Sequence, residues 1–214
     1  MNDPVDDAPR PHAVARVRAA CLAHGETLPR LDRGVPGKAR CAGCRLIPSH
    51  CMCAYRASVP TRAGVCLLMA GFEALKPSNT GWLVADVVPD THAFAWSRMH
   101  VDPGLLALLD DPRWQPVLVF PGEFAAPERV VTMLAQGGAG RRPLFVLLDG
   151  TWSQARRAFR KSPYLDRLPV LSLAPGRLSR YRLRRAWHEH HLCTAEVAAL
   201  CLEAAGDARA ARLL

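Results

Sequence analysis

The chain has 214 residues, 50% of them hydrophobic, and its 28 Lys and Arg against 19 Asp and Glu give a formal net charge of +9. This hydrophobic content excludes wholesale disorder, and no apolar run approaches the ~20 residues that a membrane span needs. The segment 1–11 is polar and proline-rich, without the apolar stretch of a secretory signal. The sequence therefore predicts a cytoplasmic protein without a membrane partner, built either as one large domain or as one domain with a small appendage.

The basic elements flank a nearly neutral centre. Residues 1–60 carry a net charge of +4, residues 61–150 of −2, and residues 151–214 of +7. Between Arg156 and Arg185 ten basic residues face a single acid, Asp166. Such a dense basic stretch indicates a polyanion partner, with nucleic acid as the leading candidate. The alternative is an arginine-rich composition that reflects a GC-rich genome.

In chain order, short apolar runs alternate with helical patterns. A basic helix is expected around Val14 to His24, and the later helices are expected at 80–88, 126–136, 152–159 and 194–206. Four apolar runs predict buried strands at 65–69, 117–120, 144–148 and 170–173. This alternation predicts an α/β fold with a mostly parallel sheet, whose ligands bind at the carboxyl ends of the strands.

Four cysteines cluster in a turn-rich stretch with the spacing C-x2-C-x6-C-x-C. A tetrahedral thiolate zinc site needs two ligand-bearing turns face to face, and C-x2-C is the usual first half. The alternatives are a disulfide pair, which the lack of a signal peptide disfavours, and four unrelated thiols. We expect a structural Zn²⁺ in a module of residues 1–60, ahead of a catalytic domain of residues 61–214. The predicted ligands are Cys41, Cys44, Cys51 and Cys53.

The third apolar run leads directly into Asp149-Gly150-Thr151-Trp152. A carboxylate at the tip of a buried strand lies where polar groups meet a ligand, and Thr151 is placed to cap the next helix. In the alternative interpretation Asp149 or Thr151 is only a cap and Trp152 belongs to the core.

A second polar segment, Glu73 to Gly81, follows the first predicted strand and so lies at the same edge. Glu73 and Lys76 bring opposite charges, and Asn79 and Thr80 supply hydrogen-bonding groups. A capped helix entrance explains Asn79 and Thr80 without any function.

A third segment, Leu178 to Arg185, alternates arginines with other residues. In an extended strand Arg180, Arg182 and Arg184 would share one face, and Tyr181 could stack on a base. The alternative is an exposed edge protected by charge.

Together these segments resemble the DTW-domain proteins, a family of tRNA-uridine aminocarboxypropyltransferases. The resemblance runs from Cys41 to about Gly206 and rests on four ordered motifs. These are the cysteine cluster; Glu73-x2-Lys76-Pro77-x-Asn79-Thr80-Gly81; Asp149-x-Thr151-Trp152; and Ser179-Arg180-Tyr181-x-Leu183-Arg184 with Cys193-Thr194-Ala195-Glu196. One departure is Ala70, where the family often has a histidine three residues before the glutamate.

The resemblance implies a SPOUT-like sheet with a knotted C-terminal half that binds S-adenosylmethionine. By analogy, the adenosine would rest on backbone groups of three loops: Phe120, Pro121 and Gly122; Leu171 and Leu173; and Leu192, Cys193 and Thr194. The substrate-binding residues would be Glu73, Lys76, Asn79, Thr80, Arg180, Tyr181, Arg182 and Arg184. Of these, the three arginines would meet either RNA phosphate or the amino acid carboxylate.

The implied reaction transfers a 3-amino-3-carboxypropyl group from S-adenosylmethionine to N3 of a uridine in tRNA, releasing methylthioadenosine. Asp149 is then the general base or the group that orients the uracil, Thr151 fixes the turn, and Trp152 packs against uracil or the cofactor. Two alternatives are an RNA methyltransferase on the same fold and a zinc-bearing RNA-binding protein without catalysis. The sequence makes no prediction of the oligomeric state.

Overall fold

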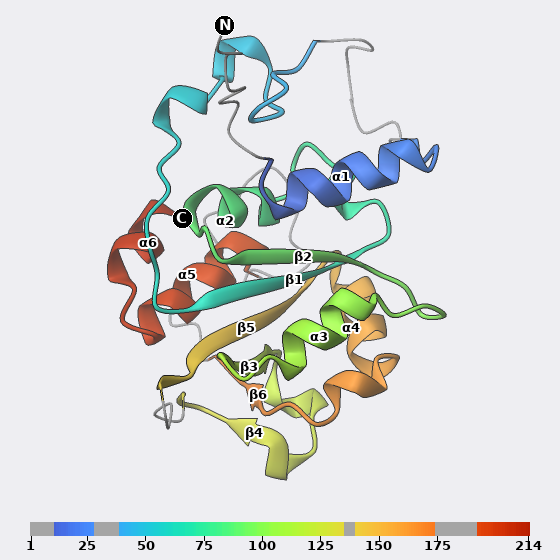
Figure 1. Ribbon diagram of the computed structural model, residues 1–214, viewed down its shortest axis with the longest axis vertical. Helices are drawn as coiled ribbons and strands as arrows, with labels where there is room; N and C mark the ends of the chain where they lie inside the picture. The colour runs from blue at the N-terminus through green and yellow to red at the C-terminus, as the bar shows by residue number, and fades with distance from the viewer. Residues whose placement is uncertain (1–10, 28–38, 135–139, 174–191) are drawn as a thin grey trace, which may run out of the picture.

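A six-stranded sheet forms the centre of the protein, and every paired strand runs parallel to its neighbour. The computed structural model describes residues 11–27, 39–134, 140–173 and 192–214. The strand order is β2-β1-β5-β3-β6-β4, as Figure 1 shows. The strands are β1 (Gly64–Ala70), β2 (Thr91–Trp96), β3 (Trp114–Val119), β4 (Val130–Val131), β5 (Arg142–Asp149) and β6 (Val170–Leu171).

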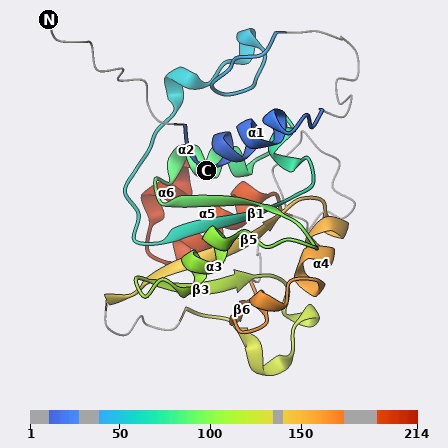
Figure 2. The same cartoon turned by 45° about the vertical axis from the view of Figure 1, so that its right-hand side comes forward.

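Helices cover both faces of the sheet. One hydrophobic core joins the sheet to α1 (Ala13–Ala23), α2 (Gly81–Val87), α5 (Thr194–Ala204) and α6 (Ala208–Leu213). A second core lies under α3 (Pro103–Asp110) and α4 (Trp152–Arg160), on the opposite face (Figures 1 and 2). None of the described helices is long and apolar enough to cross a membrane.

The alternation of side chains along β5 decides where its last residue points. Phe145 and Leu147 belong to the core on the α2 and α5 face, whereas Leu144 and Val146 belong to the core on the α4 face. Because successive side chains of a strand point to opposite faces, Asp149 shares the face of Phe145 and Leu147. The carboxylate is therefore directed toward the starts of α2 and α5.

The structure confirms the mostly parallel α/β fold and all four predicted strands. It also confirms the helices predicted near 14–24, 80–88, 152–159 and 194–206. A knot is expected in the C-terminal half, of which residues 174–191 lie outside the described residues, so it stays a prediction.

The helix predicted at 126–136 is wrong. Pro127–Arg129 form a single 3-10 turn, and Val130–Val131 pair with β6 as the edge strand β4. The two β-branched residues prefer a pleated, half-buried surface to a helix, and this preference outweighs the apolar spacing. The sequence also did not predict β2, which is only partly buried, α3, which Asp102 caps through the amide of Gly104 (2.7 Å), or the short C-terminal helix α6.

The cysteine-rich segment after α1 forms a small module on the side of α1 and α2 (Figure 1). Its regular structure consists of two 3-10 turns, Pro48–His50 and Cys53–Tyr55. Such a segment has little core of its own, so its order depends on the cysteine cluster and on contacts with the sheet domain.

Candidate active site

Asp149 joins three elements at the carboxyl edge of the sheet. Its side chain is buried at 2% exposure, and its Oδ2 accepts a hydrogen bond from Asn79 Nδ2 (2.7 Å). Its Oδ1 accepts a hydrogen bond from Thr194 Oγ1 (2.6 Å), at the first residue of α5. A Cβ at Gly81 would lie 2.8 Å from Asp149 Oδ2, so the close approach of α2 to the carboxylate requires glycine there. The predicted residues Asp149, Asn79 and Thr194 are thus brought together.

The segment before α2 presents a chain of charged and polar groups to Asp149. Lys76 Nζ pairs with Glu73 Oε2 at 2.5 Å, and Asn79 Nδ2 lies 3.5 Å from Glu73 Oε1. Asn79 Oδ1 also accepts from the backbone N–H of Trp82 (3.0 Å), which caps α2. Asn79 therefore caps α2 and also orients the Asp149 carboxylate. The sequence left open whether Asn79 is a helix cap or a residue of the site, and the structure is consistent with both.

Thr80 connects α2 to α5. Its Oγ1 accepts from the backbone N–H of Ala195 (3.3 Å), and its side chain is buried. Glu73, Asn79 and Thr80 are all buried, which favours a positioning role over direct contact with RNA.

Thr151 begins α4 through a capping box. The Thr151 Oγ1 accepts from the Gln154 amide (3.3 Å), and Gln154 Oε1 accepts from the Thr151 amide (2.9 Å). This pair satisfies two backbone donors that a helix start leaves without partners. The structure thus gives Thr151 the cap that the sequence predicts.

Trp152 belongs to an aromatic cluster on the α4 face, opposite the face toward which Asp149 points. Its ring stacks on Phe120 with centroids 5.4 Å apart and planes 8° apart, and Phe124 meets it edge-on at 5.8 Å. Phe120 is buried, while Trp152 keeps 38% of its surface exposed. The exposed indole is therefore held in place at the binding edge.

The first two of the three predicted cofactor loops are bonded directly to each other. The Gly122 amide donates to Ser172 Oγ (3.0 Å), and the Phe120 amide donates to the Leu171 carbonyl (3.3 Å). A Cβ at Gly122 would lie 3.0 Å from Val130 Cγ1, so this turn has little room for a side chain.

The third loop, Leu192 to Thr194, reaches Asp149 through the Thr194 hydroxyl. The Cys193 amide donates to Glu196 Oε2 (2.8 Å) and completes the start of α5. The predicted RNA contacts Arg180, Tyr181, Arg182 and Arg184 lie outside the described residues.

The four predicted zinc ligands converge on one point. Their sulfur atoms all lie within 4.8 Å of one another, with contacts of 3.5 Å (Cys41 to Cys53), 3.6 Å (Cys51 to Cys41) and 3.7 Å (Cys44 to Cys51). A tetrahedron with zinc–sulfur bonds of about 2.3 Å has sulfur–sulfur edges of about 3.8 Å. A disulfide would bring two sulfurs to about 2.05 Å. The spacing therefore fits a zinc ion and excludes disulfides among these four thiols.

The thiol pKa values also favour a cation. Backbone amides, that of Cys44 foremost, lower the pKa of Cys41 to about 6. Hydrogen bonding to Cys41 and Cys51 raises the pKa of Cys53 to about 12. If all four crowded thiols ionised without a metal, their negative charges would repel one another. A bound divalent metal ion offsets this repulsion. A Cβ at Gly43 would lie 2.8 Å from Cys53 Sγ, so the tight turn between Cys41 and Cys44 needs glycine.

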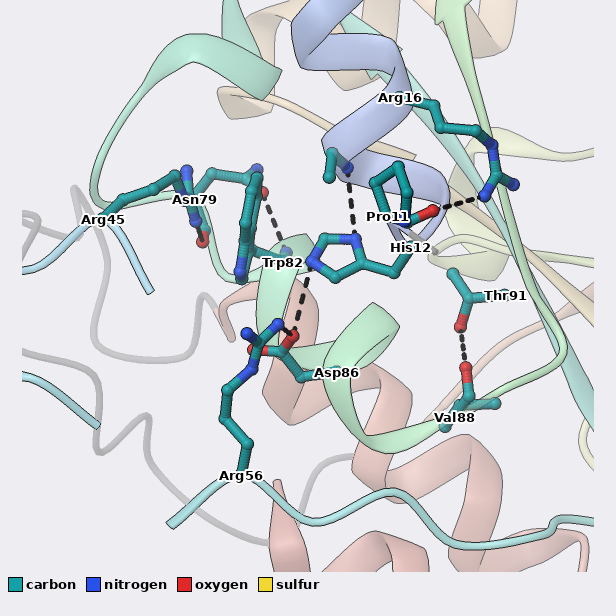
Figure 3. Close-up of polar contacts among 11 residues, drawn as sticks. Pro11, His12, Arg16, Arg45, Arg56, Asn79, Trp82, Asp86, Val88 and Thr91 are labelled. Carbon is teal, nitrogen blue, oxygen red and sulfur yellow. Dashed lines mark hydrogen bonds and ion pairs between the residues drawn. The ribbon is translucent and has the colours of Figure 1, made fainter. Parts of the chain in front are cut away.

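Arg45 connects the cysteine module to the candidate active site. Its Nη1 donates to the Lys76 carbonyl (2.7 Å) and its Nη2 to the Asn79 carbonyl (3.1 Å), while the guanidinium lies 3.9 Å from the centre of a Trp82 ring. Figure 3 shows Arg45 beside Asn79 and Trp82. Arg45 is buried at 6% exposure, and this burial lowers its pKa to about 10. Sequence reasoning missed Arg45, because nothing in the spacing distinguishes it from the other arginines.

A second contact fixes α1 and the cysteine module to α2 (Figure 3). Arg56 pairs with Asp86, and His12 Nε2 lies 3.3 Å from the same Asp86 Oδ1, at ion-pair distance but without hydrogen-bond geometry. His12 Nδ1 accepts from the Ala15 amide (3.1 Å), which places the proton of the neutral ring on Nε2. Burial first, and then the charge of Arg56, lowers the pKa of His12 to about 4. The neutral ring serves as the N-cap of α1.

Sequence comparison identifies the family. The DTW domain matches residues 38–214. The chain belongs to the DTW-domain family. Over 105 residues it is 38% identical to tRNA-uridine aminocarboxypropyltransferase 2 of Drosophila melanogaster, a match that covers 49% of this chain and 38% of the fly protein. No solved structure shows significant similarity to the chain.

Proposed function

We propose that this DTW-domain protein transfers a 3-amino-3-carboxypropyl group from S-adenosylmethionine to N3 of a uridine in tRNA. The products are acp3U and methylthioadenosine. The observation that carries the proposal is the buried cluster of Asp149, Asn79 and Thr194 at the carboxyl edge of a parallel sheet, in a chain of this family. The name of the fly relative supports the same chemistry.

The cofactor proposal rests on the three loops at this edge. A backbone hydrogen bond between Phe120 and Leu171 holds two of these loops together, and Gly122 keeps the turn between them free of a side chain. These features suit an adenosine held by backbone groups, with Leu173 and Leu192 to Thr194 on its other sides. When bound, S-adenosylmethionine supplies an electrophilic carbon next to a sulfonium, and the orientation of the loops selects which carbon the uridine meets.

Asp149 is the proposed acceptor of the uridine N3 proton. Asn79 and Thr194 hold its two oxygens in fixed directions, and a general base must lie within hydrogen-bonding reach of the proton that it removes. Glu73 and Lys76 position Asn79, while the exposed indole of Trp152 offers a surface on which uracil or the cofactor can stack.

The Asp149→Asn variant tests this assignment with little disturbance of the fold. The new amide can accept from Asn79 and donate to the Thr194 hydroxyl, which rotates freely. We expect turnover to fall by about 10² or more, with tRNA binding unchanged. Wild-type turnover in this variant, with the same pH profile, would remove Asp149 from the chemistry.

The decisive experiment incubates the protein with labelled S-adenosylmethionine and total tRNA, followed by mass spectrometry of the nucleosides. An aminocarboxypropyl uridine supports the proposal. A methylated nucleoside would instead identify a methyltransferase. Labelled cofactor that neither binds nor transfers, together with tRNA binding, would identify a non-catalytic RNA-binding protein.

A further inference from the structure

A basic hollow of about 350 Å³ lies beside α4, away from the Asp149 cluster. It is lined by Trp96, Arg98, Arg157, Arg160 and Lys161, so four cations and one indole meet without an acidic residue among them. Trp96 and Arg98 come from the end of β2 and the segment that follows it, whereas the other three come from the last turns of α4 and the residue after it. We call this surface the basic pocket.

Among the described residues, the cations of the basic pocket have no acidic partner. Within the described part of the chain, none of the four lies within 4.0 Å of a carboxylate, while arginines elsewhere do: Arg113 pairs with Asp111, and Arg167 with Asp110. All four side chains are exposed. Concentrated positive charge with no internal counterion favours an anionic ligand.

The local structure holds the pocket in shape. Trp96 Nε1 donates to Ser162 Oγ (2.8 Å), and Ser162 is buried, so the indole bridges the end of β2 and the turn after α4. Ala155 and Ala158 bury the inner side of α4 against the sheet, which leaves Arg157 and Arg160 on the outer side. Basic residues at a helix C-terminus also interact favourably with the helix dipole, but that effect does not bring Arg98 from another element to the same hollow.

Two estimates place the pocket at the same edge of the sheet as Asp149, on the α4 face. Arg157 and Arg160 lie five and eight residues beyond the start of α4, which corresponds to roughly 7 to 12 Å along the helix axis. Across the sheet, Trp96 is in register with Ala70 and Met69 with Asp149, so the end of β2 lies two strand spacings, or about 10 Å, from the end of β5. Figures 1 and 2 both show β2 and α4 meeting at this edge.

We propose that the basic pocket binds backbone phosphates of the RNA substrate one to three nucleotides from the target uridine. A nucleic-acid strand advances roughly 3.4 Å per stacked nucleotide, and further when extended, which matches a separation of about 10 Å. Guanidinium groups suit phosphate because they donate two parallel hydrogen bonds, and the half-buried indole of Trp96 offers a face for a base or ribose. This inference rests on the proposed function, which supplies both the RNA ligand and the target uridine beside Asp149.

The test compares Arg157→Gln/Arg160→Gln with a control that removes the same charge elsewhere. The control is Arg209→Gln/Arg212→Gln, two exposed arginines of α6 on the opposite face of the sheet. Dissociation constants for tRNA are measured at several salt concentrations, and S-adenosylmethionine binding and thermal unfolding are measured on the same samples.

We expect the pocket variant to bind tRNA at least tenfold more weakly near 0.1 M salt. The slope of log K against log salt should become shallower by about 1.4 to 1.8, since each of the two lost phosphate contacts contributes about 0.7 to 0.9. Cofactor binding and unfolding temperature should match the wild type, and the control should keep the wild-type slope.

An unchanged slope in the pocket variant, an equal loss in the control, or no tRNA binding by the wild-type protein would overturn the proposal. Failure of the proposed function has a different signature. In that case the wild-type protein binds tRNA, and the pocket variant still shows the shallower salt dependence, but no aminocarboxypropyl uridine is formed.

Discussion

Replacing Arg45 by methionine tests whether the cysteine module is part of the active site or only attached to it. Arg45 follows the predicted zinc ligand Cys44 directly and donates to the carbonyls of Lys76 and Asn79, on the segment that orients Asp149. Methionine fills a similar volume and has no donor. Both residues meet the same backbone strain at the positive φ of this position (63°), so that strain cancels in the comparison.

The expected loss of stability follows from the contacts that disappear. Each hydrogen bond from a charged donor contributes about 1.5 to 3 kcal/mol, and the stacking on Trp82 adds about 0.5 to 2 kcal/mol. Methionine carries no charge, so the variant avoids the cost of burying the guanidinium, which also lowers the pKa of Arg45. This saving offsets part of the loss. We expect Arg45→Met to lower the free energy of unfolding by about 3 kcal/mol, and Arg45→Lys, which keeps one donor, by about half as much.

Urea unfolding, zinc content and single-turnover transfer on tRNA measure the three consequences separately. Arg45→Met should retain one zinc per chain and lose at least tenfold in turnover well below its unfolding temperature, because the Asn79 backbone loses its anchor. The control is Arg141→Met, which removes an arginine that donates twice to the Trp114 carbonyl at the other end of the sheet. Wild-type turnover in folded Arg45→Met would refute the link between the module and the site.

Three further predictions follow from the same geometry. Chelation of zinc, or Cys44→Ser, should unfold the cysteine module and reduce turnover in parallel with zinc content; metal analysis and activity on the same fractions check this. His12→Asn should keep the cap of α1 but flatten the pH dependence of stability. The pKa of His12 in the folded protein is lowered to about 4, so the unfolded chain binds a proton more readily between pH 6.5 and pH 4. His12 therefore lowers the stability of the wild-type protein by at most about 3 kcal/mol over this range as the pH falls. Urea unfolding at several pH values in this range shows whether the variant lacks this contribution. Thr194→Val should lower stability by about 1.5 to 3 kcal/mol and slow transfer, because it removes the hydrogen bond from the Thr194 hydroxyl to Asp149 Oδ1. The tRNA dissociation constant should stay unchanged, because Thr194 is not a proposed RNA contact.

The sheet centre was predictable because its strands are buried on both faces. β1, β5 and the end of β3 are continuous apolar runs, and each leads to a break that marks its carboxyl end. The edge elements gave weaker signals. β2 alternates small and aromatic residues with partial burial, and β4 is two residues long, so pairing with a neighbour decides the structure there more than local preference does.

Much of the candidate site was predictable for a related reason. In a parallel sheet the polar residues after buried strands meet at one edge, which brings Asp149 and Asn79 together although they are 70 positions apart in the chain. The link from Arg45 and the basic pocket could not be predicted. Both depend on which side chains converge from separate elements, and arginines in an arginine-rich chain carry no spacing signal.

The distribution of charge acquires a structural meaning from these two features. Arg45 is buried at the junction between the cysteine module and α2, so this part of the N-terminal positive charge stabilises the fold and cannot meet RNA directly. Arg157, Arg160 and Lys161 are exposed beside the carboxyl edge of the sheet and have no acidic partner among the described residues. Net charge alone would treat these arginines as equivalent. Neutralising Arg45 should therefore change stability and turnover with little effect on the salt dependence of tRNA binding. Neutralising Arg157 and Arg160 should change that salt dependence with little effect on stability.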